Sequence, residues 1–304
     1  FIVNNKKTLP LKIKGSSFVN PIHYIEKRGS AQCKSTVMLA ALNSPGKTII
    51  KAKKSRDHTE NIFRYLRIPI FVKKKELTDE IVIKGQKSFK AFKYKIPSDP
   101  SSCAFFIVLT LLSKNSELKI KNVNINQSRI GFIKVLNKMG AKIKIINIKK
   151  KFGEKQADIY VKSQSKLKKI NCSPKLSSNL IDEFLIIFLV AARAKGVSSF
   201  FNLEELNKKE SPRLKLGSKL LTKMGIKNKM TKNSIKIFGN PNIYLKKNVL
   251  ISKYLKDHRV FMTSVIAACT FGGNWTIEDP SSYKSSFPSF LKILKKLGYK
   301  FKLI

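Results

Sequence analysis

Hydrophobic and polar residues follow one another along this chain in a pattern that occurs four times. In each copy a short polar cluster precedes an apolar run of helical length, and a turn with short β-like segments follows. A second polar cluster comes about 25–29 residues after the first and opens a second predicted helix. Repeats at this period indicate an architecture built from one β/α unit used several times.

The polar clusters and the helix ends mark the four copies. The first clusters begin at Ser30, Asp99, Asp182 and Asp257, and the second at Ser55, Gln127, Lys209 and Lys284. Three copies close their second helix on Met139-Gly140, Met224-Gly225 or Leu297-Gly298, whereas the first copy closes on Leu66-Arg67 without a glycine.

Several of these clusters have the sequence of a helix start. Ser211-Pro212 and Asp99-Pro100 each predict a capping residue followed by proline at the first helical position. Asp57 and Glu60 have the spacing of a capping box. Taken singly, each cluster also fits a capped helix with solvated charges, and Asp182 fits the N-cap of the apolar run after it.

Taken together, the helix starts indicate binding of small anions. The unpaired N–H groups and the dipole at a helix N-terminus favour phosphate and carboxylate groups. Arg56, Arg213 and Arg259 stand at such starts, where a basic residue is locally unfavourable to the dipole. A bound polyanion offsets that cost, so we expect these starts to converge on a site for one.

Length and composition limit the class of protein. The 304 residues, 42% of them hydrophobic, suffice for about two domains. The longest apolar runs, such as 104–112 and 184–192, are far shorter than the ~20 residues of a membrane span and predict buried helices. No secretory signal is visible, and because the sequence opens on Phe1, we expect an N-terminal portion to be missing.

The net charge of +44 has two interpretations. Lysine-rich faces neutralise nucleic-acid phosphates, but the lysines here are scattered through every segment and no nucleic-acid-binding module is recognisable. The four cysteines have no metal-binding or disulfide spacing, which predicts free thiols in a reducing compartment.

Seven motifs in register resemble the C-terminal two-thirds of the 5-enolpyruvylshikimate-3-phosphate synthase family. They are Leu9–Gly15, Ser30–Ser35, Ser55–Glu60, Leu180–Glu183, Lys209–Arg213, Asp257–Arg259, and Asp279-Pro280 with Phe287-Pro288. No motif of the sister enzymes that act on UDP-N-acetylglucosamine is visible.

The resemblance implies an α/β protein with the two-domain enolpyruvyl transferase fold, an inside-out, barrel-like arrangement of repeated β/α units. Residues 1–96 are then the later part of an incomplete first domain, and residues 97–304 are most of the second. The implied reaction transfers the enolpyruvyl group from phosphoenolpyruvate to the 5-hydroxyl of shikimate 3-phosphate and releases phosphate. The family needs no metal or organic cofactor. A cytoplasmic monomer without nucleic-acid or membrane partners is expected.

The resemblance also assigns roles to residues at two acid–base positions. The attacking hydroxyl must lose a proton and the methylene must gain one. Asp182 matches the family's carboxylate at the hydroxyl, Glu210 its proton-transfer carboxylate at the methylene, and Lys209 a lysine near both substrates.

Further residues match the family's binding groups. Phosphoenolpyruvate is expected to contact Gln32, Arg213, Arg259 and Lys284, and shikimate 3-phosphate to contact Ser30, Ala31, Gln32, Ser55, Arg56, Asp182 and Lys209. Asp257 and His258 are expected to orient Arg259.

The sequence departs from the family pattern at three points, and two alternative functions remain. The family's lysine near Phe-Pro falls at Ser285 here, with Lys284 one place earlier, and Pro212 stands where aspartate is common. The family's early substrate-binding loops have no counterpart in this sequence.

The alternatives are a basic nucleic-acid-binding α/β protein and a homologue that keeps the fold without catalysis. Retention of Asp182, Glu210, Arg213 and Arg259 together argues against the second.

Overall fold

The computed structural model describes residues 15–85, 88, 90–177 and 179–303, and its contacts divide the chain into two compact units. The first unit comprises residues 1–95 and 151–154, and the second comprises residues 96–150 and 155–304. Of the motif Leu9–Gly15, only Gly15 is among the described residues. The assignment of residues 1–96 and 97–304 to the family's two domains stays a prediction.

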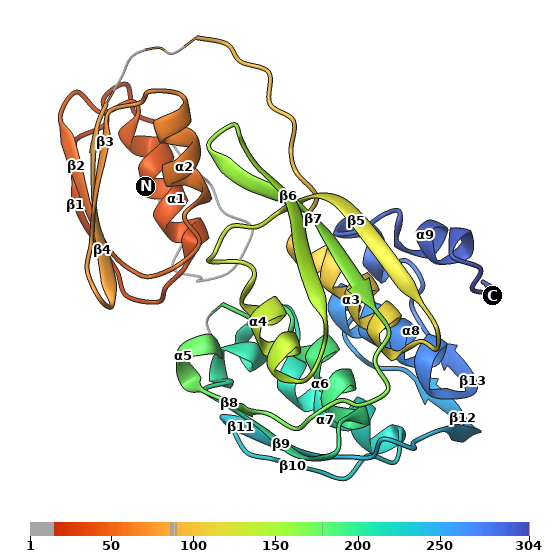
Figure 1. Cartoon of the computed structure of the whole chain (residues 1–304). Coiled ribbons are helices and arrows are strands. Elements are labelled where there is room, and N and C mark those ends of the chain that lie inside the picture. Colours follow the sequence, from red (N-terminus) through yellow and green to blue (C-terminus); the bar gives the residue numbers. More distant parts are fainter. Residues whose placement is uncertain (1–14, 86–87, 89, 178, 304) are drawn as a thin grey trace. The chain divides into compact units, whose positions relative to one another are not determined.

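The first unit combines a four-stranded sheet with two helices (Figure 1). Its elements are β1 (His23–Glu26), α1 (Ala31–Ala41), β2 (Lys47–Lys53), α2 (His58–Tyr65), β3 (Ile70–Lys74) and β4 (Thr78–Lys84). β1 and β2 run parallel on either side of α1 in the sequence, and β4 and β3 continue the sheet antiparallel. Alternate residues of β2 and β4 are buried with residues of both helices in one small core, which includes Met38, Ile50, Phe63, Ile81 and Ile83.

The second unit holds three sheets and most of the helices. Its strands are β5 (Glu117–Asn124), β6 (Ile143–Lys151), β7 (Glu154–Lys162), β8 (Asn171–Cys172), β9 (Gly196–Phe201), β10 (Asn228–Met230), β11 (Ser234–Gly239), β12 (Leu245–Ile251) and β13 (Gly272–Ile277). Its helices are α3 (Pro100–Leu112), α4 (Gly131–Lys138), α5 (Pro174–Ser177), α6 (Phe184–Arg193), α7 (Arg213–Lys223), α8 (His258–Phe271) and α9 (Phe290–Lys296), with 3₁₀ turns η1 (Glu204–Lys208) and η2 (Ser282–Ser285).

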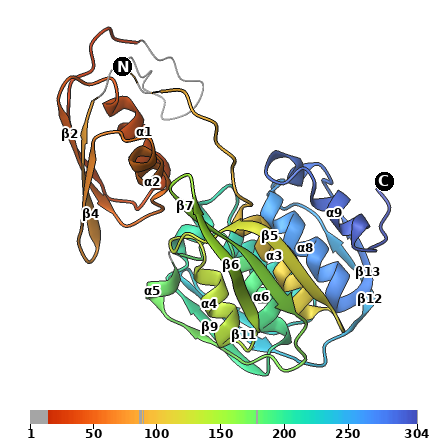
Figure 2. The ribbon, with the colours of Figure 1, turned by 45° about the horizontal axis from the view of Figure 1, so that its top comes forward.

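Three apolar helices form the centre of the second unit, and the sheets lie outside them (Figure 2). α3, α6 and α8 contact one another, and nearly every side chain of α3 and α6 is buried. A helix that is hydrophobic on all sides must be surrounded by protein. The buried helices predicted at 104–112 and 184–192 are therefore confirmed, as is the inside-out α/β fold class.

The predicted repeat is visible in the order of the strands. The three sheets that contain a hairpin have orders β1-β2-β4-β3, β5-β7-β6 and β8-β9-β11-β10, so the last strand of each copy always lies between the others. The strand before each first helix pairs in parallel with the strand after it, as in β1 with β2, β8 with β9 and β12 with β13. In the second copy this pair is reduced to a parallel bridge between Ser98 and Val123.

The four helix closures are structurally equivalent. Gly140, Gly225 and Gly298 follow α4, α7 and α9 with φ of +97°, +77° and +90°. Arg67 takes the same left-handed conformation after α2, with φ of 57°. Each closure has the hydrogen bond from the next amide back across the last turn, from Ile68, Ala141, Ile226 and Tyr299. This is the helix-ending motif in which glycine normally occupies the left-handed position. Arg67 adopts this conformation although its side chain makes it less favourable than for glycine.

The predicted helix starts are correct in one case and wrong in two. Asp99 caps α3 by accepting a hydrogen bond from the Ser102 amide, and Pro100 is the first helical residue. Ser211 is not the cap of α7: Pro212 occupies that position, and the Ser211 hydroxyl donates to Asp257 instead. The capping box is also wrong, since among the described residues the Asp57 side chain makes no capping hydrogen bond for α2.

The tip of the β6–β7 hairpin, residues 151–154, belongs to the first unit and packs on α2. Glu154 Oε1 lies 2.7 Å from His58 Nδ1, and the ring of Phe152 meets that of Tyr65 edge to face at 5.7 Å. Gly153 is required there, because a Cβ would come within 2.7 Å of the Asn61 carbonyl oxygen.

Two compositional predictions agree with the described residues. None of their helices is long and apolar enough to cross a membrane. Cys33, Cys103, Cys172 and Cys269 are all free thiols, and burial raises the pKa of Cys103 and Cys269 to about 12, which leaves those thiols protonated at neutral pH.

Candidate active site

Five of the predicted site residues gather in the second unit, where separate segments meet. Asp182 lies just before α6, Lys209 and Glu210 follow η1, Arg213 begins α7, and Arg259 lies in the first turn of α8. These segments are the two helix starts of the third copy of the repeat and the first helix start of the fourth copy. We call this set the Asp182 cluster.

Three cations surround the carboxylate of Asp182, whose side chain is 10% exposed. Lys209 Nζ lies 3.8 Å and Arg213 Nη1 3.5 Å from Asp182 Oδ1. Arg259 Nη2 lies 3.8 Å from Asp182 Oδ2, while its Nη1 donates a 2.7 Å hydrogen bond to the Asp182 carbonyl oxygen. A partly open carboxylate amid cations suits charged substrates whose reaction moves a proton.

Arg213 is the buried centre of the cluster, only 1% exposed, and three carboxylates share its guanidinium. Its Nε lies 2.9 Å from Asp257 Oδ2, its Nη2 lies 2.6 Å from Glu210 Oε2, and its Nη1 faces Asp182. The Glu210 side chain itself is 59% exposed. Arg213 therefore fixes the two predicted acid–base carboxylates relative to each other.

Asp257 joins α7 to α8 from a fully buried position. It accepts from the Ser211 hydroxyl at 2.7 Å and from Arg213, and its Oδ1 accepts from the Arg259 amide at 2.8 Å. Burial alone would raise the pKa of Asp257, but the Arg213 and Ser211 hydrogen bonds outweigh it and hold the pKa below its usual range. Asp257 holds the backbone of Arg259, as its predicted orienting role requires.

His258 follows Asp257 at the start of α8. Burial lowers the pKa of His258, and the adjacent Arg259 lowers it further. The imidazole is therefore neutral at neutral pH and adds no positive charge to the cluster.

The predicted shikimate 3-phosphate residues of the first unit lie at two neighbouring helix starts. The Ser30 hydroxyl caps α1 by accepting from the Cys33 amide, and Ala31 and Gln32 form the first turn of that helix. Ser55 and Arg56 lie between β2 and α2. The Ser55 hydroxyl oxygen is buried and has no hydrogen-bond partner in the part of the chain that the structure describes.

A buried ion pair, which the sequence reasoning missed, holds these two helix starts together. Lys34 Nζ lies 2.6 Å from Glu60 Oε1 and also donates to the Arg56 carbonyl oxygen at 2.8 Å. Both side chains are almost fully buried. Because its spacing from Asp57 predicted a capping role for Glu60, the sequence reasoning did not consider an ion pair between Glu60 and Lys34. The available signal was a lysine on the inward face of α1, one turn after Ser30.

Lys284 does not join the Asp182 cluster. It lies in η2, and its exposed side chain makes no hydrogen bond or ion pair among the described residues. The predicted contact of Lys284 with phosphoenolpyruvate stays a prediction.

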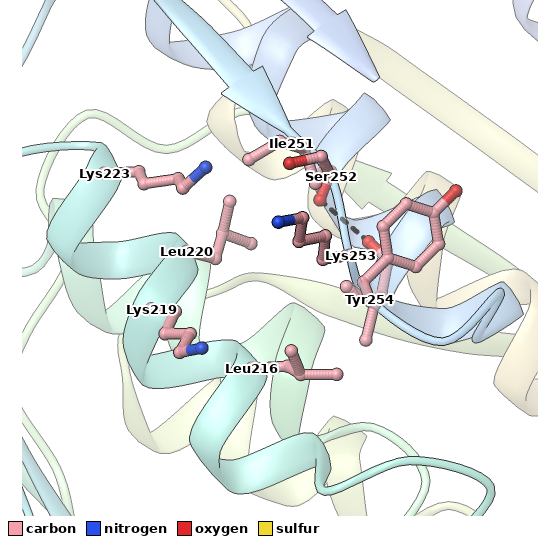
Figure 3. Close-up of a pocket in the computed structure, with 10 residues that line it drawn as sticks. Leu216, Lys219, Leu220, Lys223, Ile251, Ser252, Lys253 and Tyr254 are labelled. Atoms are coloured by element: carbon pink, nitrogen blue, oxygen red, sulfur yellow. Dashed lines mark hydrogen bonds between the residues drawn. The ribbon is translucent and has the colours of Figure 1, made fainter. Parts of the chain in front are cut away.

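A cavity of about 200 Å³ lies elsewhere in the second unit, between α7, α8 and the segment after β12 (Figure 3). Lys219, Lys223 and Lys253 stand around an apolar floor that includes Leu220 and Ile251. Its lining holds none of the predicted site residues. Across residues 15–303, leaving out the few that are not described, no group of three or more His, Cys, Asp or Glu side chains is placed to hold a metal ion.

Comparison with known proteins shows the family of this chain. The family model described as EPSP synthase (3-phosphoshikimate 1-carboxyvinyltransferase) matches residues 1–294. A 3-phosphoshikimate 1-carboxyvinyltransferase of Ruthia magnifica is 37% identical over all of this chain and 68% of its own length. Its counterpart from Thermodesulfovibrio yellowstonii is 38% identical over 95% of this chain and 65% of its own length. The chain thus spans about two thirds of the length of these relatives.

Solved structures give the same result. An EPSP synthase from Acinetobacter baumannii superposes with a TM-score of 0.85 and 30% identity, covering 97% of this chain and 66% of its own. The enolpyruvyl transferase NikO from Streptomyces tendae, at 14% identity and a TM-score of 0.71, shares the fold. The resemblance inferred from seven motifs is confirmed: this chain belongs to the EPSP synthase family.

Proposed function

We propose that this chain carries most of the machinery that transfers the enolpyruvyl group from phosphoenolpyruvate to the 5-hydroxyl of shikimate 3-phosphate, with release of phosphate. Family membership supports the reaction class. The observation that carries the proposal is the Asp182 cluster, in which two carboxylates and three cations from three helix starts meet. The proposal covers the chain together with whatever supplies the remaining third of the family's length.

Two carboxylates of the cluster suit the two proton transfers. Asp182 accepts the proton of the attacking hydroxyl as the new C–O bond forms at C2 of the enol phosphate, and Glu210 supplies a proton to the methylene carbon, which becomes a methyl group. Return of one methyl proton to Glu210 then re-forms the double bond as the C–O bond to phosphate breaks and phosphate leaves. General acid–base catalysis needs both groups within hydrogen-bond reach of their substrate atoms. Arg213, which faces both Asp182 and Glu210, supports this division of roles because it holds the pair at a fixed separation.

The cations suit the charges of phosphoenolpyruvate. Arg259 presents a planar fork on the partly open side of the cluster, with its side chain 15% exposed. Such a fork pairs with carboxylate or phosphate through two parallel hydrogen bonds. Lys209, one third exposed, contributes a mobile point charge next to Asp182. Arg213 is already occupied by three carboxylates, so we assign it chiefly to holding them.

The helix starts of the first unit suit shikimate 3-phosphate. The first turn of α1 carries Ser30, Ala31 and Gln32, and α1 is tied to Ser55 and Arg56 through Lys34. The buried Ser55 hydroxyl without a described partner fits a group that gains its hydrogen bond from a ligand. Monomeric state and a cytoplasmic location stay predictions from the sequence.

The nucleic-acid alternative is not favoured by the comparisons. A homologue without catalysis is the remaining alternative, and the intact Asp182 cluster argues against it.

Equilibrium binding tests the proposal against the nucleic-acid alternative. We expect phosphoenolpyruvate and shikimate 3-phosphate to bind to this chain with dissociation constants between about a micromolar and a millimolar, the usual range for enzyme substrates. Single-stranded and duplex DNA of mixed sequence are the competing ligands, titrated at two salt concentrations. Tight polymer binding that falls steeply with salt, with no binding of either small phosphate, would overturn the proposed function.

A further inference from the structure

A hydrogen-bonded chain of polar groups begins at Glu183, the residue after Asp182. It has no part in the reaction proposed for the Asp182 cluster. Glu183, 4% exposed, accepts a hydrogen bond of 2.5 Å from the Ser101 hydroxyl. The Ser101 oxygen in turn accepts from Arg129 Nη2 at 3.0 Å, and the same nitrogen pairs with Asp99 Oδ1 at 2.6 Å. The chain thus connects the start of α6 to the first turn of α3 and to the segment before α4.

The direction of the Glu183 side chain is unusual for its position. Glu183 is the N-cap residue of α6, where an acidic side chain normally turns back to accept from its own helix. Among the described residues it makes no such bond, and its carboxylate reaches across to Ser101 on α3. Burial of a carboxylate costs free energy unless hydrogen bonds and nearby positive charge compensate. A buried carboxylate that bonds to another helix therefore indicates that its own backbone must be held in one position.

That backbone also carries Asp182. The amide of Glu183 closes a turn onto the Leu180 carbonyl oxygen, and the carbonyl oxygen of Asp182 accepts from Arg259 Nη1. The distances from the Asp182 carboxylate to its three cations, 3.5 to 3.8 Å, are those of ion pairs rather than short hydrogen bonds. The position of the Asp182 carboxylate relative to Arg259 therefore depends on where this turn holds the backbone.

We infer that Glu183 is a positioning residue: its carboxylate, anchored on Ser101, which Arg129 holds in turn, keeps the Asp182–Glu183 turn in place so that Asp182 and Arg259 keep their mutual geometry. The effect of Glu183 on substrate binding and turnover rests on the proposed function. The mutual geometry of Asp182 and Arg259 can be measured without substrate. Burial raises the pKa of Glu183, and the neighbouring Asp182 raises it further, against the lowering effects of Arg259, Ser101 and Arg129. An amide oxygen in place of the carboxylate accepts the same hydrogen bond and avoids the buried charge.

Three variants separate positioning from mere stability. Glu183→Ala removes the anchor, Glu183→Gln keeps its acceptor, and Ser101→Ala removes the donor while leaving Glu183 in place. Ser102→Ala is the matched control, because the Ser102 hydroxyl bonds to Asp99 and not to Glu183. Melting curves establish that each variant folds, and Ser101→Ala decides the question if Glu183→Ala does not fold.

The first readout is the guanidinium NMR signal of Arg259, assigned by its loss in Arg259→Lys. In the unmodified chain we expect a slowly exchanging signal, because Arg259 donates to the Asp182 carbonyl oxygen. Glu183→Ala and Ser101→Ala should shift and broaden it, while Glu183→Gln and Ser102→Ala should retain it. An unchanged signal in folded Glu183→Ala or Ser101→Ala, even with a lower melting temperature, would overturn the inference.

The second readout is binding of phosphoenolpyruvate, followed by its phosphorus signal. Glu183→Ala should weaken binding about tenfold, the effect of losing one hydrogen bond to a charged group, and Glu183→Gln should restore it. If phosphoenolpyruvate binds neither to the unmodified chain alone nor to the chain supplied with the N-terminal third of the Ruthia magnifica relative, the proposed function fails while the Arg259 signal still decides the positioning role. If binding is normal in the unmodified chain and in folded Glu183→Ala, the positioning role fails alone.

Discussion

Arg213 Nε lies 2.9 Å from Asp257 Oδ2, and both side chains are almost completely buried. This pair joins the first residue of α7 to the cap of α8, and the same two residues hold Glu210 and the Arg259 amide. The predicted acid–base pair and the predicted phosphoenolpyruvate arginine therefore share one buried anchor. Damage to this anchor should affect stability and substrate binding together.

Removal of one partner of the anchor should be strongly destabilising. Asp257→Ala leaves the Arg213 guanidinium buried with one carboxylate fewer, which typically costs about 3–5 kcal/mol. Urea unfolding followed by circular dichroism measures the loss. Glu205→Ala is the control, because Glu205 forms an exposed pair with Lys208 and its removal should leave the unfolding free energy almost unchanged. Equal effects of the two substitutions would contradict the anchor.

The same anchor should make stability depend on pH in the acid range. The folded state holds the pKa of Asp257 below its unfolded value of about 3.9. The stabilising contribution is therefore complete above the unfolded pKa and is lost as pH falls through the folded pKa. We expect the free energy of unfolding of the unmodified chain to fall more steeply below pH 4 than that of Asp257→Asn. Parallel curves for the two proteins would remove Asp257 from this role.

Asp182→Asn should depress turnover much more than substrate affinity. Asparagine keeps the shape of the side chain but cannot take the proton of the attacking hydroxyl, and loss of one general base lowers turnover by about 10²- to 10⁴-fold. Steady-state kinetics of a preparation with measurable turnover provide the test, with Asn179→Ala, on the exposed turn before the cluster, as the control. Unchanged turnover would exclude Asp182 from the proton transfer.

Arg259→Ala should discriminate between the two substrates. Its fork lies on the partly open side of the Asp182 cluster, so its loss should weaken phosphoenolpyruvate about tenfold or more, as expected for a charged hydrogen-bonding group. Binding of shikimate 3-phosphate should change far less, since its predicted phosphate contacts lie on α1 and before α2. Calorimetric titration of each ligand alone measures both effects. A similar loss for the two ligands would refute the assignment of Arg259.

Arg67→Gly should stabilise the chain. Arg67 is exposed and holds φ at 57°, a conformation that costs a residue with a side chain about 1–2 kcal/mol, partly offset by the greater chain entropy of glycine. We expect a gain of about 0.5 kcal/mol in unfolding free energy. The reverse change, Gly225→Ala at an equivalent closure with no atom within 4 Å of the new Cβ, should destabilise the protein. A destabilising Arg67→Gly would show that the arginine side chain makes a contribution larger than the backbone strain.

Features that recur in each copy of the repeat could be predicted from the sequence, because each copy carries the same local pattern of polar and apolar residues. The eight helices of the four copies, the buried runs of α3 and α6 and the closing glycines all follow from local pattern. The Asp182 cluster could be predicted because its members stand at helix starts of the repeat and match motifs of the family. The left-handed closure of the first copy, at Arg67, could be located from its position in the repeat, although an arginine gives no signal for a positive φ.

Buried polar contacts between segments could not be predicted in the same way. Glu60 was interpreted as a capping partner of Asp57 because the spacing fits, yet its carboxylate is buried against Lys34 from another helix. Ser211 was interpreted as a cap, yet it donates to Asp257, 46 positions away. The links from Glu183 through Ser101 to Arg129 join residues whose partners depend on the packing of α3 against α6. Pairings of this kind are decided by tertiary contacts, which local spacing does not encode.

The most direct test of the central claim is phosphorus NMR of this chain incubated with phosphoenolpyruvate and shikimate 3-phosphate, followed over time, with Asp182→Asn in a parallel sample. Because the chain spans two thirds of its relatives' length, the incubation is repeated with the separately supplied N-terminal third of the Ruthia magnifica relative. We predict that free phosphate and the enolpyruvyl ether appear together in at least one sample of the unmodified chain and are strongly reduced with Asp182→Asn. Absence of both products from the unmodified chain under both conditions, or an equal rate with Asp182→Asn, would contradict the account.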